Sequence, residues 1–269
     1  MKPMFALTGI TLALCSLAFA QESTGEKVVV PARNSTRPRK VDVSIMHGSV
    51  TVKAYSGKEV IVESRRSSER ARTPEVVEGM RRIDLPSRGF SVEEEDNVIT
   101  VRTGISTSPE LVISVPADTS LKLHTMHGDL NAEGVSGEID VNTTNGRVKL
   151  TNVSGSVLAH SLNGPITVVM DKVDPAKPLS FSTMNGTIDV TLPADFKANV
   201  KLNTNHGEIW SDFDFKLGGG GGITQQNNTS DGKFRVSVDR SAMTGTINGG
   251  GAEATFHTFN GKIYIRKKK

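Results

Sequence analysis

Hydrophobic and polar residues alternate along most of the chain in short runs, and seven of these runs surround a glycine in the same way. Each glycine follows an asparagine or a histidine. Mostly apolar residues stand seven and five positions before it and two and four positions after it. The seven glycines are Gly48, Gly128, Gly146, Gly164, Gly186, Gly207 and Gly261. Alternation with a period of two predicts half-buried β-strands on both sides of a turn.

The residue pair at each corner predicts that the turn is tight. Glycine adopts a positive φ without a steric penalty, and asparagine tolerates it better than most residues. We therefore expect a structural, turn-forming role for the seven glycines and for the four asparagines that precede some of them. These asparagines are Asn145, Asn163, Asn185 and Asn260, and histidines (His47, His127 and His206) replace them in the other copies.

The spacing of the glycines favours one all-β architecture. Eighteen residues separate Gly128 from Gly146 and Gly146 from Gly164, and later copies follow after 22 and 21 residues. A β-solenoid of 18–22-residue rungs with Asn-Gly or His-Gly corners accounts for this period, because like residues would stack on successive rungs. A nearly pure column of threonine and serine, three positions before the glycine, supports it. In the alternative, an antiparallel β meander or sandwich, the same corners would be hairpin turns.

The ends of the chain predict export and a single repeat domain. Residues 1–20 read as a signal peptide, with Lys2, an apolar run too short to cross a bilayer and a small-residue cleavage site at Ala18-Phe19-Ala20. A lipoprotein signal at Cys15 is disfavoured by the large Leu14 before it. Polar, Arg/Pro-rich residues 21–40 are expected to form a flexible leader. The β-strand-repeat domain then spans 41–269, with an inserted short helix at about 67–82 and a Gly-rich loop at 217–233.

Charge and hydropathy narrow the set of partners. The chain carries 32 basic and 29 acidic residues, a balance too even to predict a nucleic-acid partner. No later apolar run is long enough for a transmembrane helix after signal cleavage. No cofactor or catalytic motif is expected, since neither a Gly-x-Ser-x-Gly sequence nor a phosphate-binding loop occurs.

Three groups of residues are tested for chemistry. Asp189 and Glu208 are the nearest pair of acids for a glycosidase, about one rung apart, although solvated surface charge is the favoured interpretation. His124, His160 and His257 share a column, but the first two are two rungs apart and no metal site is predicted. Trp210 is an outward aromatic residue. We expect it to pack under a cap, with contact to a sugar or a protein as the alternative.

The sequence Leu111 to Pro116, then Met126 to Leu130 and the repeated Asn-Gly-x-Ile units resemble a bacterial β-strand-repeat family of unknown function that carries the provisional name adhesin. The resemblance covers most of residues 41–266. It implies an envelope or secreted protein with a β-solenoid-like domain and no assigned catalytic residues. Its motifs specify architecture more than activity.

Together these features predict a non-enzymatic exported β-repeat protein, an adhesin or cell-envelope interaction module that is periplasmic, envelope-associated or secreted. The expected partner is an envelope polysaccharide or a surface protein, and the oligomeric state is left open. The alternatives are a carbohydrate-active enzyme on a β-helix and a purely structural envelope protein.

Overall fold

The computed structural model describes residues 26–33, 38–66, 89–104, 108–218, 222–228, 233–239 and 242–269. The described residues form strands and no helix, and none of them makes a helix that could cross a membrane. The predicted signal peptide (1–20) and the predicted short helix (about 67–82) lie outside the described residues.

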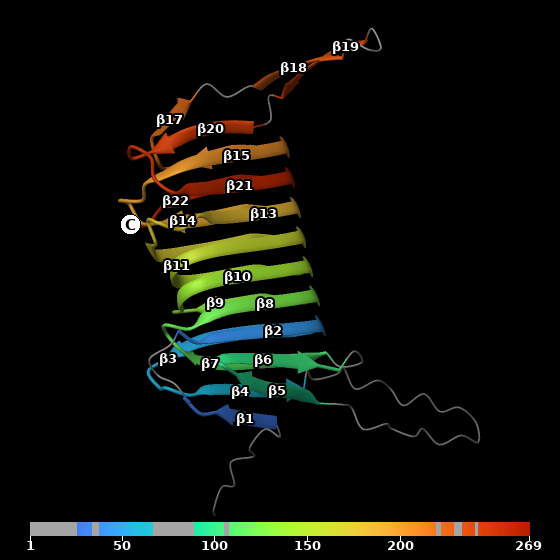
Figure 1. Ribbon diagram of the computed structural model, residues 1–269, viewed down its shortest axis with the longest axis vertical. Coiled ribbons are helices and arrows are strands. Elements are labelled where there is room, and N and C mark those ends of the chain that lie inside the picture. The colour runs from blue at the N-terminus through green and yellow to red at the C-terminus, as the bar shows by residue number, and fades with distance from the viewer. Residues whose placement is uncertain are drawn as a thin grey trace, which may run out of the picture.

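Most strands belong to parallel coils that stack along the long axis of the molecule (Figure 1). Seven coils each have a strand in a front layer, one of the seven glycine corners and a strand in a back layer, and the strands at 98–103 and 109–116 add a further coil outside the repeat. From bottom to top, the front layer contains β6 (Val98–Thr103), β2 (Lys40–His47), β8 (Ser120–His127), β10 (Ser136–Asn145), the second half of β11 (Val148–Asn163), β13 (Leu179–Asn185), β21 (Glu253–Asn260) and β15 (Ala198–His206).

The back layer follows the same order. It contains β7 (Pro109–Pro116), β3 (Ser49–Tyr55), β9 (Leu130–Glu133), the first half of β11, β12 (Ile166–Val173), β14 (Ile188–Leu192), β22 (Ile263–Lys267) and β16 (Ile209–Ser211). All of these neighbours pair in parallel, with like positions of successive repeats opposite one another. The solenoid prediction is therefore confirmed, and the antiparallel meander is not the arrangement of the repeats.

The coils do not stack in chain order. The last pair of strands, β21 and β22, lies between the coil of β13 and β14 and the coil of β15 and β16. Near the other end, β2 and β3 lie between the coil of β6 and β7 and the coil of β8 and β9. Repeats that are neighbours in the sequence are therefore not always neighbours in space.

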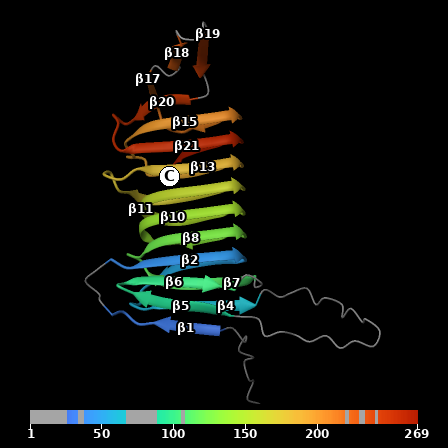
Figure 2. The ribbon, with the colours of Figure 1, turned by 45° about the vertical axis from the view of Figure 1, so that its right-hand side comes forward.

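Antiparallel strands cover both ends of the stack (Figure 2). At the bottom, β5 (Phe90–Glu95) pairs with β6, β4 (Val60–Arg66) pairs with β7, and β1 (Glu26–Val30) pairs with β4. At the top, β20 (Ala242–Ile247) pairs with β15, and β17 (Phe215–Gly218) pairs with β20. These additions occupy strand edges that would otherwise invite pairing with other chains.

Two predicted irregular segments contain strands. The flexible leader predicted at 21–40 includes β1, because Val28, Val29 and Val30 favour a strand and the edge of β4 offers a partner. The Gly-rich loop predicted at 217–233 includes β18 (Gly222–Asn228), which forms an antiparallel pair with β19 (Lys233–Asp239). Backbone pairing between β18 and β19 satisfies polar groups in a segment whose composition alone suggests a loop.

The core lies between the two layers and is built from the predicted apolar columns. The residues seven and five positions before each corner glycine are buried, as are almost all of those two and four positions after it. Phe181 and Phe256, which are far apart in sequence, stack one coil apart with ring centroids 5.2 Å from each other. Aromatic contacts of this kind add to the energy of burial.

Candidate functional site

The seven glycine corners form one straight edge of the stack, because each corner is hydrogen-bonded to the next. The amide of Gly128 donates to the carbonyl of Asn145 over 2.9 Å, and the amide of Gly164 donates to that of Asn185 over 3.0 Å. A Cβ on Gly146 would overlap the carbonyl oxygen of Gly128 on the neighbouring coil. The same overlap recurs at the other corners, so glycine is required by close stacking of the backbones.

This steric reason differs from the one that the sequence suggests. Gly48 (φ 113°) and Gly128 (φ 144°) have the expected positive φ, but Gly146, Gly186 and Gly207 do not. The four corner asparagines also lie outside the positive-φ region, as the last residues of their strands. The strands therefore continue almost to the corner, and contact between coils decides the residue type.

The asparagine side chains form a ladder along this edge. Asn163 Nδ2 donates to Asn145 Oδ1 over 3.0 Å, and Asn185 Nδ2 donates to Asn163 Oδ1 over 2.8 Å. Asn260 extends the ladder to Asn185 over 2.8 Å. Below it, Asn145 Nδ2 lies 3.2 Å from His127 Nδ1, and the ring of His127 stacks on that of His47. In-register amide ladders are a known source of stability in stacked β-structures.

Buried hydroxyls secure the corner from inside. Thr183 Oγ1 donates to the carbonyl of Gly164 over 3.1 Å, and Thr258 Oγ1 donates to that of Gly186 over 3.2 Å. Thr143, Ser161 and Thr204 make the equivalent bonds. Thr125 is buried in the same column, but its hydroxyl has no hydrogen-bond partner. The corner residues thus satisfy one another and leave little polar capacity for a ligand.

A more open group of side chains lies on the back layer at the upper coils. Trp210 on β16 is 57% exposed, and its neighbour in the register on β22 is Tyr264. The guanidinium of Arg266 lies 5.1 Å from the centroid of the Tyr264 ring. The indole of Trp210 donates to Glu208 Oε2 over 3.3 Å. The expectation that Trp210 packs under a cap is wrong, since its ring faces solvent.

Ion pairs frame this aromatic group, which we call the back-layer patch (Glu208, Trp210, Lys262, Tyr264, Asp189 and Arg266). Lys262 Nζ lies 3.0 Å from Glu208 Oε2. The guanidinium of Arg266 is bidentate to Asp189, at 2.8 and 3.2 Å. The ammonium of Lys262, helped by the indole, holds the pKa of Glu208 below its usual value, and Glu208 in turn raises the pKa of Lys262.

The two acids considered for glycoside hydrolysis are both in this patch, but they are not adjacent. The coil of β22 separates Asp189 from the coil of Glu208, so two coil spacings, about 10 Å, lie between them. Each carboxylate has its own cation. A general acid needs a raised pKa, whereas the pKa of Glu208 is lowered. The one-rung separation expected from the sequence is wrong because β22 inserts between the two strands.

The histidine column and the remaining polar groups do not form a metal site in the described part of the chain. His124 and His160 are separated by Asn142, and His257 lies beyond Ser182. No cluster of three potential ligands occurs among the described residues.

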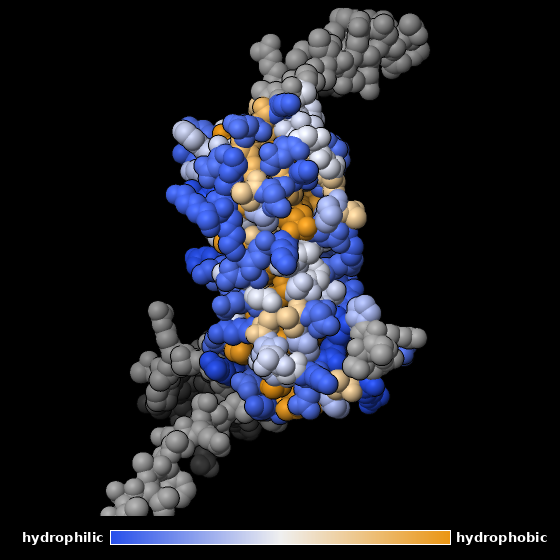
Figure 3. Space-filling view, turned by 90° about the vertical axis from the view of Figure 1, so that its left-hand side faces the viewer, coloured by the Kyte–Doolittle hydropathy of each residue, from blue (hydrophilic) through white to orange (hydrophobic). Residues whose placement is uncertain are grey.

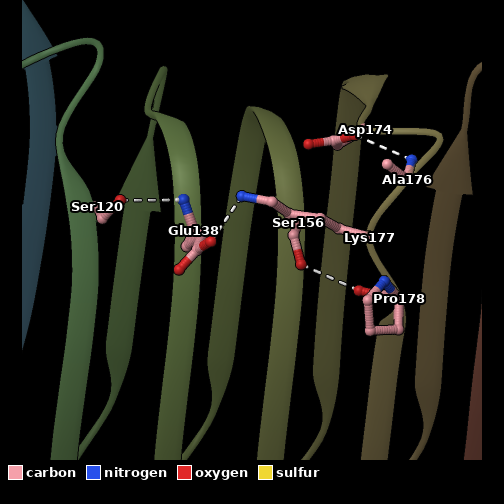
Figure 4. A network of polar contacts seen from close by, with 7 residues as sticks. All are labelled: Ser120, Glu138, Ser156, Asp174, Ala176, Lys177 and Pro178. Atoms are coloured by element: carbon pink, nitrogen blue, oxygen red, sulfur yellow. Dashed lines mark hydrogen bonds and ion pairs between the residues drawn. The ribbon is translucent and has the colours of Figure 1, made fainter. Parts of the chain in front are cut away.

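A polar network links the front-layer strands β8, β10 and β11 to the loop at 174–178 (Figure 4). Lys177 Nζ lies 2.6 Å from Glu138 Oε1, and Ser156 Oγ donates to the carbonyl of Pro178 over 3.0 Å. Lys177 lowers the pKa of Glu138. A shallow groove lies beside these residues, with Arg39 and Lys122 also on its wall. The edge of the stack opposite the corners is mainly hydrophilic, with scattered apolar residues (Figure 3). These contacts attach the loop at 174–178 to the neighbouring strands β10 and β11.

A comparison with protein families identifies the architecture. The profile of Toastrack DUF4097 matches residues 40–248 of the 269 residues, well over half of the chain. The chain belongs to the Toastrack DUF4097 family. The resemblance to a bacterial β-strand-repeat family of unknown function is thereby confirmed.

Solved structures and curated proteins add little to the Toastrack assignment. A provisionally named cell adhesion protein from Clostridium sporogenes has 11% identity and a TM-score of 0.46, over 91% of this chain and 99% of that chain. A provisionally named adhesin from Bacteroides fragilis has 9% identity and a TM-score of 0.32, over 91% of this chain and 97% of that chain. No curated protein matches. Likeness at this level does not indicate what this Toastrack protein binds.

The sequence pointed to Trp210, Asp189 and Glu208 but missed Tyr264, Lys262 and Arg266 as their neighbours. The Toastrack match ends before β21 and β22, although these strands lie inside the stack. A usable signal was present, because Trp210 and Tyr264 occupy the same position relative to their glycines. The sequence does not indicate that the repeat of β21 and β22 stacks beside Trp210.

Proposed function

We propose that this Toastrack protein is an exported, non-enzymatic interaction module that contacts cell-envelope polysaccharide through the back-layer patch. The observation that carries the proposal is the solvent-exposed indole of Trp210 beside Tyr264, one coil away. An aromatic ring offers an apolar face to the C–H face of a sugar. The charged groups around it offer hydrogen bonds to the sugar hydroxyls.

The arrangement of charge supports binding over catalysis. Glu208 and Asp189 are each paired with a cation. The pKa of Glu208 is lowered by Lys262 and Trp210, whereas a general acid needs a raised pKa. Ion pairs at the surface also hold the side chains beside the rings in fixed positions. Export rests on the signal peptide that the sequence predicts at residues 1–20.

The test is a binding measurement with a turnover assay on the same samples. The protein is applied to a glycan array and to soluble peptidoglycan fragments, and calorimetry gives Kd for each glycan that binds. Trp210→Ala should weaken binding at least tenfold, while Leu162→Ala, which removes an exposed apolar side chain from the front layer, should leave Kd unchanged. Equal Kd values for both variants would reject the patch as the binding site.

The carbohydrate-active enzyme is the second candidate because both acids do lie in the patch. Release of reducing ends from any glycan that binds, abolished by Glu208→Gln, would establish it and overturn the non-enzymatic proposal. An absence of both binding and turnover with every glycan would favour a structural envelope protein.

A further inference from the structure

The outer face of the front layer is a broad parallel β-surface that no described element crosses (Figures 1 and 2). Its side chains form straight columns because the strands are in register. One column lies two positions before the glycines and is largely apolar and exposed. From bottom to top it contains Met46, Met126, Thr144, Leu162, Met184, Phe259 and Asn205.

A second column has nearly the same sequence of residue types from bottom to top as from top to bottom. The column four positions before the glycines contains, from bottom to top, Ser44, His124, Asn142, His160, Ser182, His257 and Asn203. When this order is reversed, each histidine falls opposite a histidine, and each serine falls opposite an asparagine. His160, on β11, is the midpoint of the seven strands.

The column six positions before the glycines has complementary ends. It contains Asp42, Lys122, Asp140, Leu158, Ser180, Thr255 and Lys201. Reversal places the acid Asp42 opposite the base Lys201. Leu158, 42% exposed, is at the midpoint and would meet its own copy.

We propose that two copies of this chain pack front layer against front layer, about a two-fold axis that lies between them, parallel to the strands and in front of β11. This operation keeps each column opposite itself and reverses the order of the coils. Leu158 and Leu162 then contact their own copies, and Met126 meets Phe259 of the second copy. An interface of this kind is isologous, so one surface must be complementary to itself.

The size and chemistry of the face match what a stable dimer needs. Seven strands at about 4.8 Å spacing and eight residues at about 3.3 Å each give roughly 900 Å² per copy. Standard interfaces bury about 800 Å² per partner. The apolar column supplies the dry contact, and the complementary charges at the ends favour the antiparallel order of coils over the parallel one. Lys201 also holds Glu253 at 2.6 Å, so Asp42 of the second copy would join an existing ion pair.

The dimer goes beyond the proposed function and does not depend on it, because the back-layer patch faces away from this interface. The first experiment is sedimentation velocity on the full chain across a hundredfold range of concentration. A concentration-dependent dimer is expected. Leu158→Arg should raise the dimer Kd at least tenfold, because two guanidinium groups would meet at the axis. Thr167→Arg changes the back layer of the same coil and should leave Kd unchanged.

The second experiment tests the register with a short bismaleimide in a Cys15→Ser background. His160→Cys alone should cross-link to its own copy. His124→Cys alone should not, whereas the double variant His124→Cys, His257→Cys should. A chain that stays monomeric at all concentrations would overturn the proposal, as would a dimer that Leu158→Arg leaves intact or that cross-links equally through His124→Cys. Glycan binding by a monomer would leave the proposed function standing and remove only the dimer.

Discussion

The side-chain amide of Asn163 donates to Asn145 on the coil below and accepts from Asn185 on the coil above. Asn163 therefore makes two hydrogen bonds between coils, one to each neighbour. Although this edge is exposed, the repetition ties the register of one coil to the next.

Asn163→Ala should lower the free energy of unfolding by about 1–2 kcal/mol, because two such hydrogen bonds are lost. Asn142→Ala is the matched control, since Asn142 is an outward residue of β10 that is not part of the ladder. It should change stability by less than about 0.5 kcal/mol. Urea unfolding followed by circular dichroism measures both, and equal losses would contradict a specific role for the ladder.

Gly146→Ala should be much more damaging, at about 3 kcal/mol or more, because the added Cβ overlaps the backbone carbonyl of Gly128. Gly218→Ala is the control. A Cβ there would only make ordinary contact with Thr244, at 3.7 Å. The difference should appear as a large fall in Tm for Gly146→Ala alone.

Removing the buried hydroxyl should have different effects on stability at two equivalent positions, Thr183 and Thr125. Thr183→Val removes a hydrogen bond to Gly164 and should cost about 1 kcal/mol. Thr125→Val removes a buried hydroxyl that has no partner, so it should be neutral or stabilising. Chemical denaturation of the two variants checks this, and a cost at Thr125 as large as at Thr183 would show that the hydroxyl is bonded in solution.

Phe181 and Phe256 should be energetically coupled. Each change to alanine is expected to cost about 3–5 kcal/mol. A double-mutant cycle should give a coupling energy of about 1 kcal/mol, since the two rings are in contact. Strict additivity would argue against the placement of β21 beside β13.

Acid titration tests the ion pair of Glu208 and Lys262. Carboxyl NMR should give a Glu208 pKa below its usual value of 4.5, and Lys262→Met should move it back upward. Because the folded-state pKa is lowered, the stabilisation by this pair is present above about pH 4.5. It is lost as the pH falls through the folded-state pKa. The effect on stability should be small, since both side chains are largely exposed. A Glu208 pKa that Lys262→Met leaves unchanged would contradict the pairing.

Much of this architecture could be predicted because the hydrophobic period directly reports which face of a strand is buried. The columns that include Val141, Phe181 and Ile188 are interior, as the alternation indicates. The reason for glycine at position 146 could not be predicted, since the clash involves a backbone from another coil. The back-layer patch was missed for a related reason: a repeat pattern gives the shape of each coil but not the order in which coils stack.

The stacking order also has a consequence for how the chain is made. The strands β15 and β16 precede β21 and β22 in the sequence, yet they rest on them in the molecule. The upper coil and its antiparallel cover therefore cannot take their final places until residues 253–267 are present. Residues 253–267 form an internal coil of the stack. A polypeptide that lacks them would therefore lose the layer on which β15 and β16 pack. Synthesis of residues 253–267 is thus a condition for assembly of the upper end of the stack.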